Sequence, residues 1–431
     1  MKKVAFYTLG CKVNQYETEA MSELFKNHGY EITHFEDFSD IYVINTCTVT
    51  SMSDRKSRQI IRRAKKQNPD ALVIVTGCYA QTAPDDVLKI DGVNMVLGTN
   101  ERHRIVELTK NLLLDSKEKE VYDIMNSHDF EELSITSYSE RTRAYIKIQE
   151  GCNQFCSYCI IPYARGPIRS RDPKSVIEEV KTLSKNGFCE VILTGIHVAS
   201  YGKDLDNMDL GKLLTMVNEI DGIKRIRLSS IEPMTLNEDF IKDITPCEKL
   251  CHHFHLSLQS GSDGTLKRMN RKYTTAEYKS IVKGLRAAYP DVAITTDIMV
   301  GFPGETDEEF DETVQFVKKI NFANAHVFQY SPRKGTVAAK RTDQIPSEIK
   351  EKRSKVIIDL TQKSRTEYLN SFIGKTLEVL FEQPTSDGFF EGKTDNYITV
   401  CVPPEENLSG NFFMVKAEKV NGEKIYGTII K

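Results

Sequence analysis

Short apolar runs rich in β-branched residues alternate with longer polar segments along this chain, and that alternation constrains its fold more than any other feature. In the first hundred residues the runs cover residues 4–10, 41–46 and 72–77. Runs of this kind, separated by stretches of helical length, are typical of parallel strands covered by helices on both faces. We therefore expect residues 1–110 to form an α/β domain with an open parallel sheet.

A second alternation starts at residue 143 and contains six apolar runs, at residues 144–149, 189–195, 223–230, 253–259, 293–300 and 324–330. Such units predict a partial (β/α)6 barrel, whose chemistry lies at the carboxyl ends of its strands. Helix starts are predicted from four capping-box pairs, Ser175 with Glu178, Thr235 with Glu238, Thr274 with Glu277 and Thr306 with Glu309. With a charged helix at about 347–370, this domain is expected to span residues 141–370.

Two further segments complete the predicted organisation. Residues 111–140 are acidic and weakly periodic, which suits a linker. Residues 371–431 contain short strand-like runs separated by Gly, Asp, Asn and Pro, which predicts a small β-barrel. This region holds six lysines and nine acidic residues, so general attraction to phosphate cannot be its main contribution.

The composition excludes several classes of protein. A net charge of −3 gives no global attraction for nucleic acid, so any such claim must rest on local patches. No stretch approaches the roughly 18 apolar residues of a membrane span, and the N-terminus enters a strand-like run directly. We expect a cytoplasmic protein, in which ten cysteines are better candidates for metal ligands, reactive thiols or buried small residues than for disulfides.

Cys152, Cys156 and Cys159 follow the first strand of the predicted barrel with the spacing Cys-x3-Cys-x2-Cys. A short loop of this kind can place three soft thiolates around one iron-sulfur cube. Three ligands leave one iron open to a small molecule. A zinc site usually closes with a fourth Cys or His, and none is evident between residues 145 and 175.

The segment EGCNQFCSYCIIPYARGPIRSR resembles the cluster loop of the radical S-adenosylmethionine superfamily and, more narrowly, of its methylthiotransferase branch. The resemblance covers nearly the whole chain, including a C-terminal region that looks like the TRAM barrel that binds RNA in relatives. It implies that S-adenosylmethionine binds the open iron of a 4Fe-4S cluster, with Tyr158 near the adenine. Strand-end segments that resemble further cofactor contacts contain Gly195, Gln259, Gly301 and Tyr330.

Three more cysteines, Cys11, Cys47 and Cys78, each follow one of the N-terminal strands. If these strands are parallel, all three thiols emerge at the same carboxyl edge of the sheet. The alternative is three unrelated buried residues, the commonest fate of a free cysteine. In methylthiotransferases, the segments that resemble TLGCKVNQYE, NTCTVT and TGCYAQ hold an auxiliary 4Fe-4S cluster, so the resemblance implies two clusters in this chain.

The resemblance also implies a reaction. One S-adenosylmethionine is cleaved reductively to a 5′-deoxyadenosyl radical that removes hydrogen from the substrate, sulfur comes from the auxiliary cluster, and a second S-adenosylmethionine supplies the methyl group. The motifs most resemble the branch acting on N6-threonylcarbamoyladenosine at position 37, in the anticodon loop of tRNA. The implied partners are an electron donor such as flavodoxin or ferredoxin and a sulfur source. Glu232 is a candidate contact to the modified base.

Residues 55–66 contain seven basic residues and no acidic one. This run predicts a phosphate-binding surface near the auxiliary cluster, with the candidate RNA contacts Arg55, Lys56, Arg58, Arg62 and Arg63. A solvated basic helix face is the alternative. Residues 141–174 add seven basic residues against two acidic ones, although Arg165 and Arg171 could instead order the cluster loop.

Other functions stay open from the sequence. The chain could be a methylthiotransferase for an isopentenyl-type adenosine of tRNA or for an aspartate of a ribosomal protein. It could also be an RNA-binding protein whose clusters are only structural or redox-sensing. A zinc-binding module is the remotest option, based on Cys247, Cys251, His252, His253 and His255. The sequence does not indicate the oligomeric state.

Overall fold

Six parallel strands form the N-terminal sheet in the computed structural model, which describes residues 1–136 and 142–430. In spatial order they are β2 (Glu31–Thr33), β1 (Lys3–Thr8), β3 (Ile41–Thr46), β4 (Leu72–Gly77), β5 (Met95–Leu97) and β6 (Glu118–Glu120). The three apolar runs predicted as strands are β1, β3 and β4, which lie side by side. The expected α/β domain is therefore confirmed.

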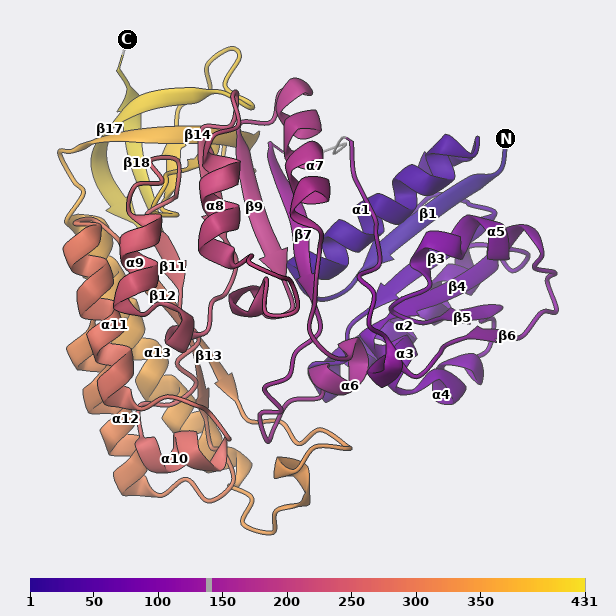
Figure 1. Ribbon diagram of the computed structural model, residues 1–431, viewed down its shortest axis with the longest axis horizontal. Coiled ribbons are helices and arrows are strands. Elements are labelled where there is room, and N and C mark those ends of the chain that lie inside the picture. Colours follow the sequence, from indigo (N-terminus) through magenta and orange to yellow (C-terminus); the bar gives the residue numbers. More distant parts are fainter. Residues whose placement is uncertain (137–141, 431) are drawn as a thin grey trace.

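Helices cover both faces of this sheet, as Figure 1 shows. They are α1 (Lys12–Asn27), α2 (Ser51–Gln67), α3 (Cys78–Thr82), α4 (Pro84–Leu88), η1 (Arg102–Arg104) and α5 (Ile105–Lys110). On one face, Ile60, Ile61 and Ala64 of α2 pack against the sheet. On the other, Met21 and Phe25 of α1 do so. Burial of apolar side chains on both faces explains why the central strands read as continuous hydrophobic runs.

The segment predicted as a linker is partly structured. Strand β6 lies within it and pairs with β5, and η2 (Ile124–Asn126) follows. Further on, Leu133 and Ile135 are buried in the core of the barrel domain. The segment thus contacts both neighbouring domains, and its last predicted residues, 137–140, lie outside the described residues together with residue 141.

The central domain is an arc of six parallel strands with helices outside, as predicted (Figure 1). Its strands are β7 (Arg143–Glu150), β9 (Glu190–Gly195), β10 (Arg225–Leu228), β11 (His253–His255), β12 (Ala293–Val300) and β13 (Asn324–Gln329). Single bridges, Ile226 with Leu250 and Ile231 with Leu256, connect the part that contains β10 to the part that contains β11. A two-residue strand, β8 (Arg169–Ser170), pairs antiparallel with β7.

The helices of this domain begin where the strands end. The long ones are α7 (Pro173–Lys185), α8 (Leu210–Asn218), α9 (Glu238–Ile244), α11 (Thr275–Ala288), α12 (Asp307–Ile320) and α13 (Ser347–Asn370). Short helical turns are α6 (Ile161–Arg165), η3 (Val198–Ser200), η4 (Pro233–Thr235), α10 (Asp263–Arg268) and η5 (Ala338–Lys340). The helix expected at about 347–370 is α13.

Two of the four predicted capping boxes are present, at Thr274 for α11 and Thr306 for α12. The other two predictions are wrong. Helix α7 is capped earlier, by Asp172, and α9 is capped later, by Asn237. Asp and Asn side chains accept hydrogen bonds from first-turn amides as well as Ser and Thr do, so the nearby acid or amide takes the cap position.

The C-terminal domain is a closed five-stranded barrel, which confirms the prediction. In spatial order its strands are β14 (Thr376–Pro384), β15 (Phe390–Lys393), β16 (Thr399–Val402), β18 (Lys424–Ile429) and β17 (Phe412–Asn421). It docks where β7 and β10 begin: Arg143 pairs with Glu382, and Arg225 pairs with Glu378 at 2.9 Å. The small barrel therefore covers the amino ends of the central strands (Figure 1).

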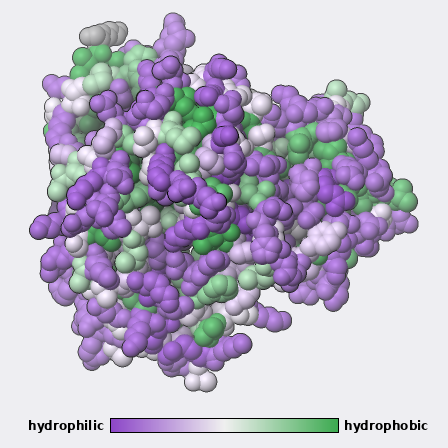
Figure 2. Space-filling view, viewed as in Figure 1, coloured by the Kyte–Doolittle hydropathy of each residue, from purple (hydrophilic) through white to green (hydrophobic). Residues whose placement is uncertain are grey.

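The surface is mostly polar. The face in Figure 2 is largely hydrophilic, with small separate hydrophobic patches. Within residues 1–136 and 142–430, no helix is both long enough and apolar enough to cross a membrane.

Candidate functional site

The register of the N-terminal sheet brings Cys11, Cys47 and Cys78 to one edge. Thr8 at the end of β1 lies opposite Asn45 of β3, and Thr46 at the end of β3 lies opposite Gly77 of β4. Each cysteine follows one of these strand ends, as the sequence analysis expected. We call these three cysteines the first-domain triad.

Two glycines let this triad form. Gly77 has φ +92°, and a Cβ there would lie 2.3 Å from the carbonyl oxygen of Thr46. Gly10 has φ +108°, and a Cβ there would lie 3.2 Å from the Sγ atom of Cys47. Because glycine alone adopts such backbone angles at little cost, the chain turns sharply out of β1 and β4 and presents the next residue, a cysteine, at the edge.

The barrel triad, Cys152, Cys156 and Cys159, lies in the loop after β7. Backbone hydrogen bonds hold this loop: the Cys152 amide donates to the Gly166 carbonyl at 3.0 Å, and the Cys159 amide donates to the Cys156 carbonyl at 2.9 Å. The thiols also accept hydrogen bonds. Cys159 Sγ accepts from the Ile161 amide at 3.4 Å, and Cys156 Sγ accepts from Arg271 Nη1 at 3.4 Å.

Both triads have the chemistry that a cluster needs. Burial raises the pKa of Cys78 and of Cys159 to about 12, and that of Cys152 to about 11. Thiolates in such surroundings require a positive partner such as a metal centre. Within the described residues, no three Cys, His, Asp or Glu side chains converge on one point that could hold a single ion. Soft thiolates suit iron-sulfur clusters, and three of them leave one iron of a four-iron cube without a protein ligand.

The histidines that suggested a zinc site have other roles. The ring of His253 stacks on Tyr397 with centroids 4.8 Å apart, and His252 Nδ1 lies 3.5 Å from Asp395. His255 Nε2 lies 3.2 Å from Asp297. The neighbouring cysteines, Cys247 and Cys251, are buried.

Two of the candidate S-adenosylmethionine contacts, Tyr158 of the barrel-triad loop and Tyr330, pack on one phenylalanine. The rings of Tyr158 and Tyr330 both pack edge-on against Phe302, with centroids 6.3 and 5.4 Å away. Gly301 has φ +69° and its amide donates to Glu305. The other two candidates lie at strand ends on either side of β10: Gln259 follows β11 and bridges to Ile298 of β12, and Gly195 ends β9.

Glu232 lies beside the barrel triad and is engaged within the protein. Its Oε2 lies 2.8 Å from His197 Nε2, and its Oε1 lies 3.1 Å from Arg271 Nη2. Burial alone would raise the pKa of Glu232, but the hydrogen bond to His197 and the charge of Arg271 outweigh it and lower that pKa. A contact of Glu232 with a modified base would have to replace one of these two bonds.

A buried charge network lies between the two triads. It consists of three carboxylates and three cations, each at most 1% exposed: Glu17, Glu131, Glu150, Arg102, Lys147 and Arg165. Arg165 ends α6, the short helix that follows Cys159, and its Nε donates to Cys78 Sγ at 3.1 Å. Helix α6 thus meets a cysteine of each triad, with Cys159 at its start and Cys78 at its end.

A cavity of about 640 Å³ opens next to both triads. Its lining includes Tyr79, which follows Cys78, and Ile160, which follows Cys159. Arg58 of α2 and Tyr163 of α6 also line it, and Arg333 reaches across from the loop after β13 to pair with Asp54 at 2.5 Å. The volume lies in the range of small-molecule and cofactor sites.

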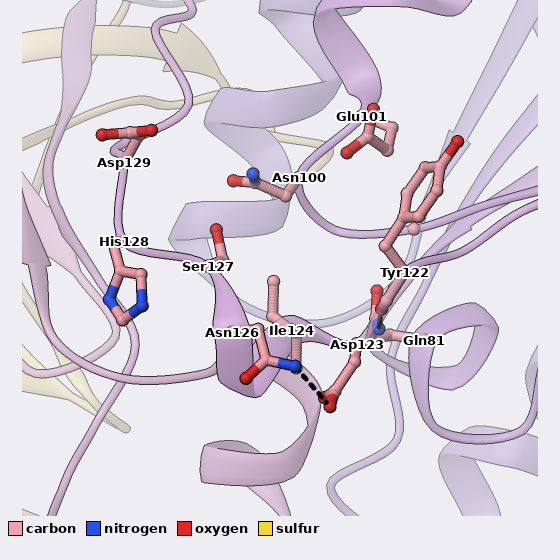
Figure 3. Close-up of a pocket in the computed structure, with 11 residues that line it drawn as sticks. Gln81, Asn100, Glu101, Tyr122, Asp123, Ile124, Asn126, Ser127, His128 and Asp129 are labelled. Atoms are coloured by element: carbon pink, nitrogen blue, oxygen red, sulfur yellow. Dashed lines mark hydrogen bonds between the residues drawn. The ribbon is translucent and has the colours of Figure 1, made fainter.

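A second cavity, of about 490 Å³, is formed by the N-terminal domain and residues 122–129 (Figure 3). Asn100, Glu101, Asp123, His128 and Asp129 line it, and the Asn126 side chain donates to Asp123 at 3.0 Å. Neither a cysteine nor a residue next to a cysteine in the chain lines it, so we do not assign it to the cluster chemistry.

The predicted RNA contacts on α2 divide into two groups. Arg55, Lys56 and Arg62 are exposed, and among the described residues they form no ion pair. Arg63 instead pairs with Glu36, and Arg58 donates to the Tyr79 hydroxyl at 3.2 Å. The second basic segment, residues 141–174, is less available than its charge suggests, because Lys147, Arg165, Arg169 and Arg171 are buried.

Sequence reasoning missed Arg102 and Arg271, whose partners are distant in the chain. Arg102 lies 29 positions from Glu131, and Arg271 lies 115 positions from Cys156. No local motif marks either arginine. For Arg165, by contrast, the alternative role of ordering the loop agrees with its burial.

Family models match three parts of the chain. Residues 146–317 match the Radical SAM superfamily, residues 370–430 the TRAM domain, and residues 3–98 the Uncharacterized protein family UPF0004. A solved structure of the radical S-adenosylmethionine methyltransferase TsrM from Kitasatospora setae, with cobalamin and a [4Fe-4S] cluster bound, has a TM-score of 0.58. It is 14% identical and covers 78% of this chain and 77% of its own, which shows a shared fold.

Curated relatives match over nearly the full length. The threonylcarbamoyladenosine tRNA methylthiotransferase MtaB of Bacillus subtilis is 44% identical over 97% of this chain and 94% of its own. The protein of the same name from Aquifex aeolicus is 41% identical over 92% and 96%. The tRNA-2-methylthio-N(6)-dimethylallyladenosine synthase of Clostridium novyi is 37% identical over 100% and 97%.

Proposed function

This chain belongs to the tRNA methylthiotransferase family of radical S-adenosylmethionine proteins, and we propose that it adds a methylthio group to C2 of N6-threonylcarbamoyladenosine at position 37 of tRNA. One observation carries the proposal: Tyr79 and Ile160, each of which directly follows a cysteine of a different triad, line one cavity of about 640 Å³. When bound, a cluster at the barrel triad with S-adenosylmethionine would supply the 5′-deoxyadenosyl radical, and a cluster at the first-domain triad would supply sulfur. Hydrogen leaves C2, and sulfur with a methyl group from a second S-adenosylmethionine replaces it.

The residues around the cavity suit a nucleobase with an acidic substituent. The rings of Phe155 and Tyr163 are 40% and 48% exposed and lie edge to face, 5.9 Å apart, beside the barrel triad. Exposed aromatic rings of this kind can stack on a base that has left its loop. The threonylcarbamoyl group ends in a carboxylate, whereas an isopentenyl group is apolar. The lining also contains Asp54, Asp85 and Asp86, of which Asp54 pairs with Arg333 and Asp85 with Lys119. Arg58 and Lys334 are the lining cations that can pair with the substrate carboxylate, which favours the threonylcarbamoyl substrate.

The exposed face of α2 supports binding of the tRNA backbone. Arg55, Lys56 and Arg62 are exposed cations of this helix, which begins four residues after Cys47, and they form no ion pair with any residue that the structure describes. Neutralised phosphates release counterions, so removal of three contacts should reduce the magnitude of the slope of log affinity against log salt by about 2 to 3. Arg63 serves as the matched control, because it lies on the same helix but pairs with Glu36.

The cofactor contacts and domain limits belong to the same proposal. We assign S-adenosylmethionine to the surface formed by Tyr158, Gly195, Gln259, Gly301 and Tyr330, and place the domains at residues 1–110, 141–370 and 371–431. The ranges matched by the family models support these limits. An electron donor such as flavodoxin or ferredoxin and a sulfur source are further partners. All ten cysteines are free, which supports the reducing cytoplasm as the location.

Mass spectrometry of tRNA nucleosides tests the proposal in a strain without 2-methylthio modification. Expression of the chain should produce 2-methylthio-N6-threonylcarbamoyladenosine, and Cys152→Ala should abolish it. Arg58→Ala should lower the yield at least tenfold while 5′-deoxyadenosine release without tRNA persists, and Arg63→Ala should change neither. A methylthio group on isopentenyladenosine alone would refute the substrate, and tRNA without any methylthio nucleoside would refute the function.

A further inference from the structure

Each triad has one buried arginine that donates a hydrogen bond to one of its cysteines. We infer that these arginines are positioning residues that raise the reduction potential of separate clusters: Arg165 acts on the cluster of the first-domain triad, and Arg271 on the cluster of the barrel triad. The inference rests on the cluster binding proposed above, but not on the identity of the RNA.

Arg165 is held rigidly between the two domains. Its Nε donates to Cys78 Sγ at 3.1 Å, and its Nη2 donates to Asn14 at 2.6 Å. Its Nη1 lies 2.6 Å from Glu17 and 3.2 Å from Glu150. Asn14 and Glu17 belong to α1, which starts directly after Cys11. The guanidinium therefore links the segments of two first-domain cysteines to the helix that follows the barrel triad.

Arg271 is fixed in the same manner on the barrel side. Its Nη1 donates to Cys156 Sγ at 3.4 Å, and its Nη2 lies 3.1 Å from Glu232. Its Nε donates to the Tyr273 hydroxyl at 3.1 Å, and the cation lies 5.0 Å from the centre of that ring. The side chain is 7% exposed, so water does little to screen its charge.

The electrostatic effect has a definite sign. Reduction adds one negative charge to a cluster, and a fixed cation that donates an N–H bond to a ligand sulfur stabilises the reduced form more than the oxidised form. Each arginine should therefore make its own cluster easier to reduce. The effect should be local, because each guanidinium bonds to a cysteine of only one triad within the described residues.

Redox titration followed by electron paramagnetic resonance tests this inference in the reconstituted full chain. Triple Cys→Ala variants of each triad assign the two signals. Arg165→Gln should reduce the ratio of reduced to oxidised first-domain cluster at a fixed potential about tenfold, a shift of about −59 mV for one electron. The barrel cluster should not shift. Arg271→Gln should have the reverse selectivity, and Arg165→Lys, which keeps the charge, should recover most of the shift.

Arg353→Gln is the matched control. This arginine is also buried and pairs with Glu305 and Asp307, at 2.5 and 2.7 Å, but it contacts no cysteine among the described residues. It should leave both potentials unchanged.

The inference would be overturned if the potentials stay unchanged in Arg165→Gln and Arg271→Gln, or if both clusters shift equally. Modification of tRNA could persist in either case. A chain without bound iron would overturn the proposed function as well. If Arg165→Gln does not fold, pulsed resonance of wild-type protein labelled with ¹⁵N-arginine decides. Nitrogen coupling to the reduced first-domain cluster supports the inference, and its absence overturns it.

Discussion

Removal of Arg102 should loosen the junction between the N-terminal domain and the barrel. Arg102 is the centre of the buried charge network: it pairs with Glu17, lies 2.7 Å from Glu131 and lies 3.8 Å from Glu150. In Arg102→Met, Glu17 and Glu150 keep Lys147 and Arg165 as partners, whereas Glu131 stays buried and loses its arginine. The side chain has similar volume, so the change removes charge more than it removes packing.

The magnitude follows from Glu131. Contact with Arg102 and its neighbours lowers the pKa of Glu131 from 4.5 to about 2, against the effect of burial. That difference of about 2.5 corresponds to roughly 3 kcal/mol in favour of the ionised carboxylate. Breaking a buried ion pair by removal of one partner typically costs about 3–5 kcal/mol. We therefore expect Arg102→Met to lower the opening free energy of this junction by about 3 kcal/mol.

Hydrogen exchange of the α1 and β7 amides measures this change, because it reports local opening in a chain with several domains. The exchange rates in Arg102→Met should rise roughly hundredfold. Arg104→Met is the control, since Arg104 is about a third exposed and its ion pairs, at 3.5 to 3.8 Å, are screened by water. If both variants exchange at the same rate, the network does not hold the junction and the reasoning is refuted.

Two further predictions concern the triad and the pH dependence. Gly77→Ala, whose Cβ would lie 2.3 Å from a backbone oxygen, should lower the iron content from about eight to about four per chain. The control is Gly29→Ala, with φ +81° and no atom within 4 Å of the added Cβ, which should keep both clusters. Equal iron contents in the two variants would contradict the steric argument. Because the folded pKa of Glu131 is depressed to about 2, its stabilising contribution is present above the usual pKa of 4.5 and is lost as the pH falls toward 2. Opening free energies of Glu131→Gln should therefore depend less on pH in this window than those of wild type, and parallel pH profiles would count against the assignment.

Features set by local pattern were predictable from the sequence. The apolar runs that form β3, β4 and β12 have the predicted bounds, because the pattern of consecutive residues determines the length and burial of a strand. The position of Cys11, Cys47 and Cys78 at one edge followed from the strand ends alone. Helix starts were less certain: near Ser175 and Thr235 another residue serves as the cap.

Features that depend on tertiary contacts were not predictable. The number of basic residues in a segment does not reveal which of them are accessible: Arg63, a predicted RNA contact, is paired, and Lys147 in the second basic segment is inside the protein. The bond from Arg165 to Cys78 joins residues 87 positions apart. A pattern of neighbouring residues cannot contain that information.

The buried charge network also determines how the junction responds to temperature. The hydration of charged groups becomes less favourable on warming, so the penalty for keeping six charged groups dry decreases, whereas the gain from burying apolar surface levels off. Hydrophobic contacts, in turn, weaken on cooling. The opening free energy of the junction between the two triads should therefore be maintained at high temperature and be smallest at low temperature.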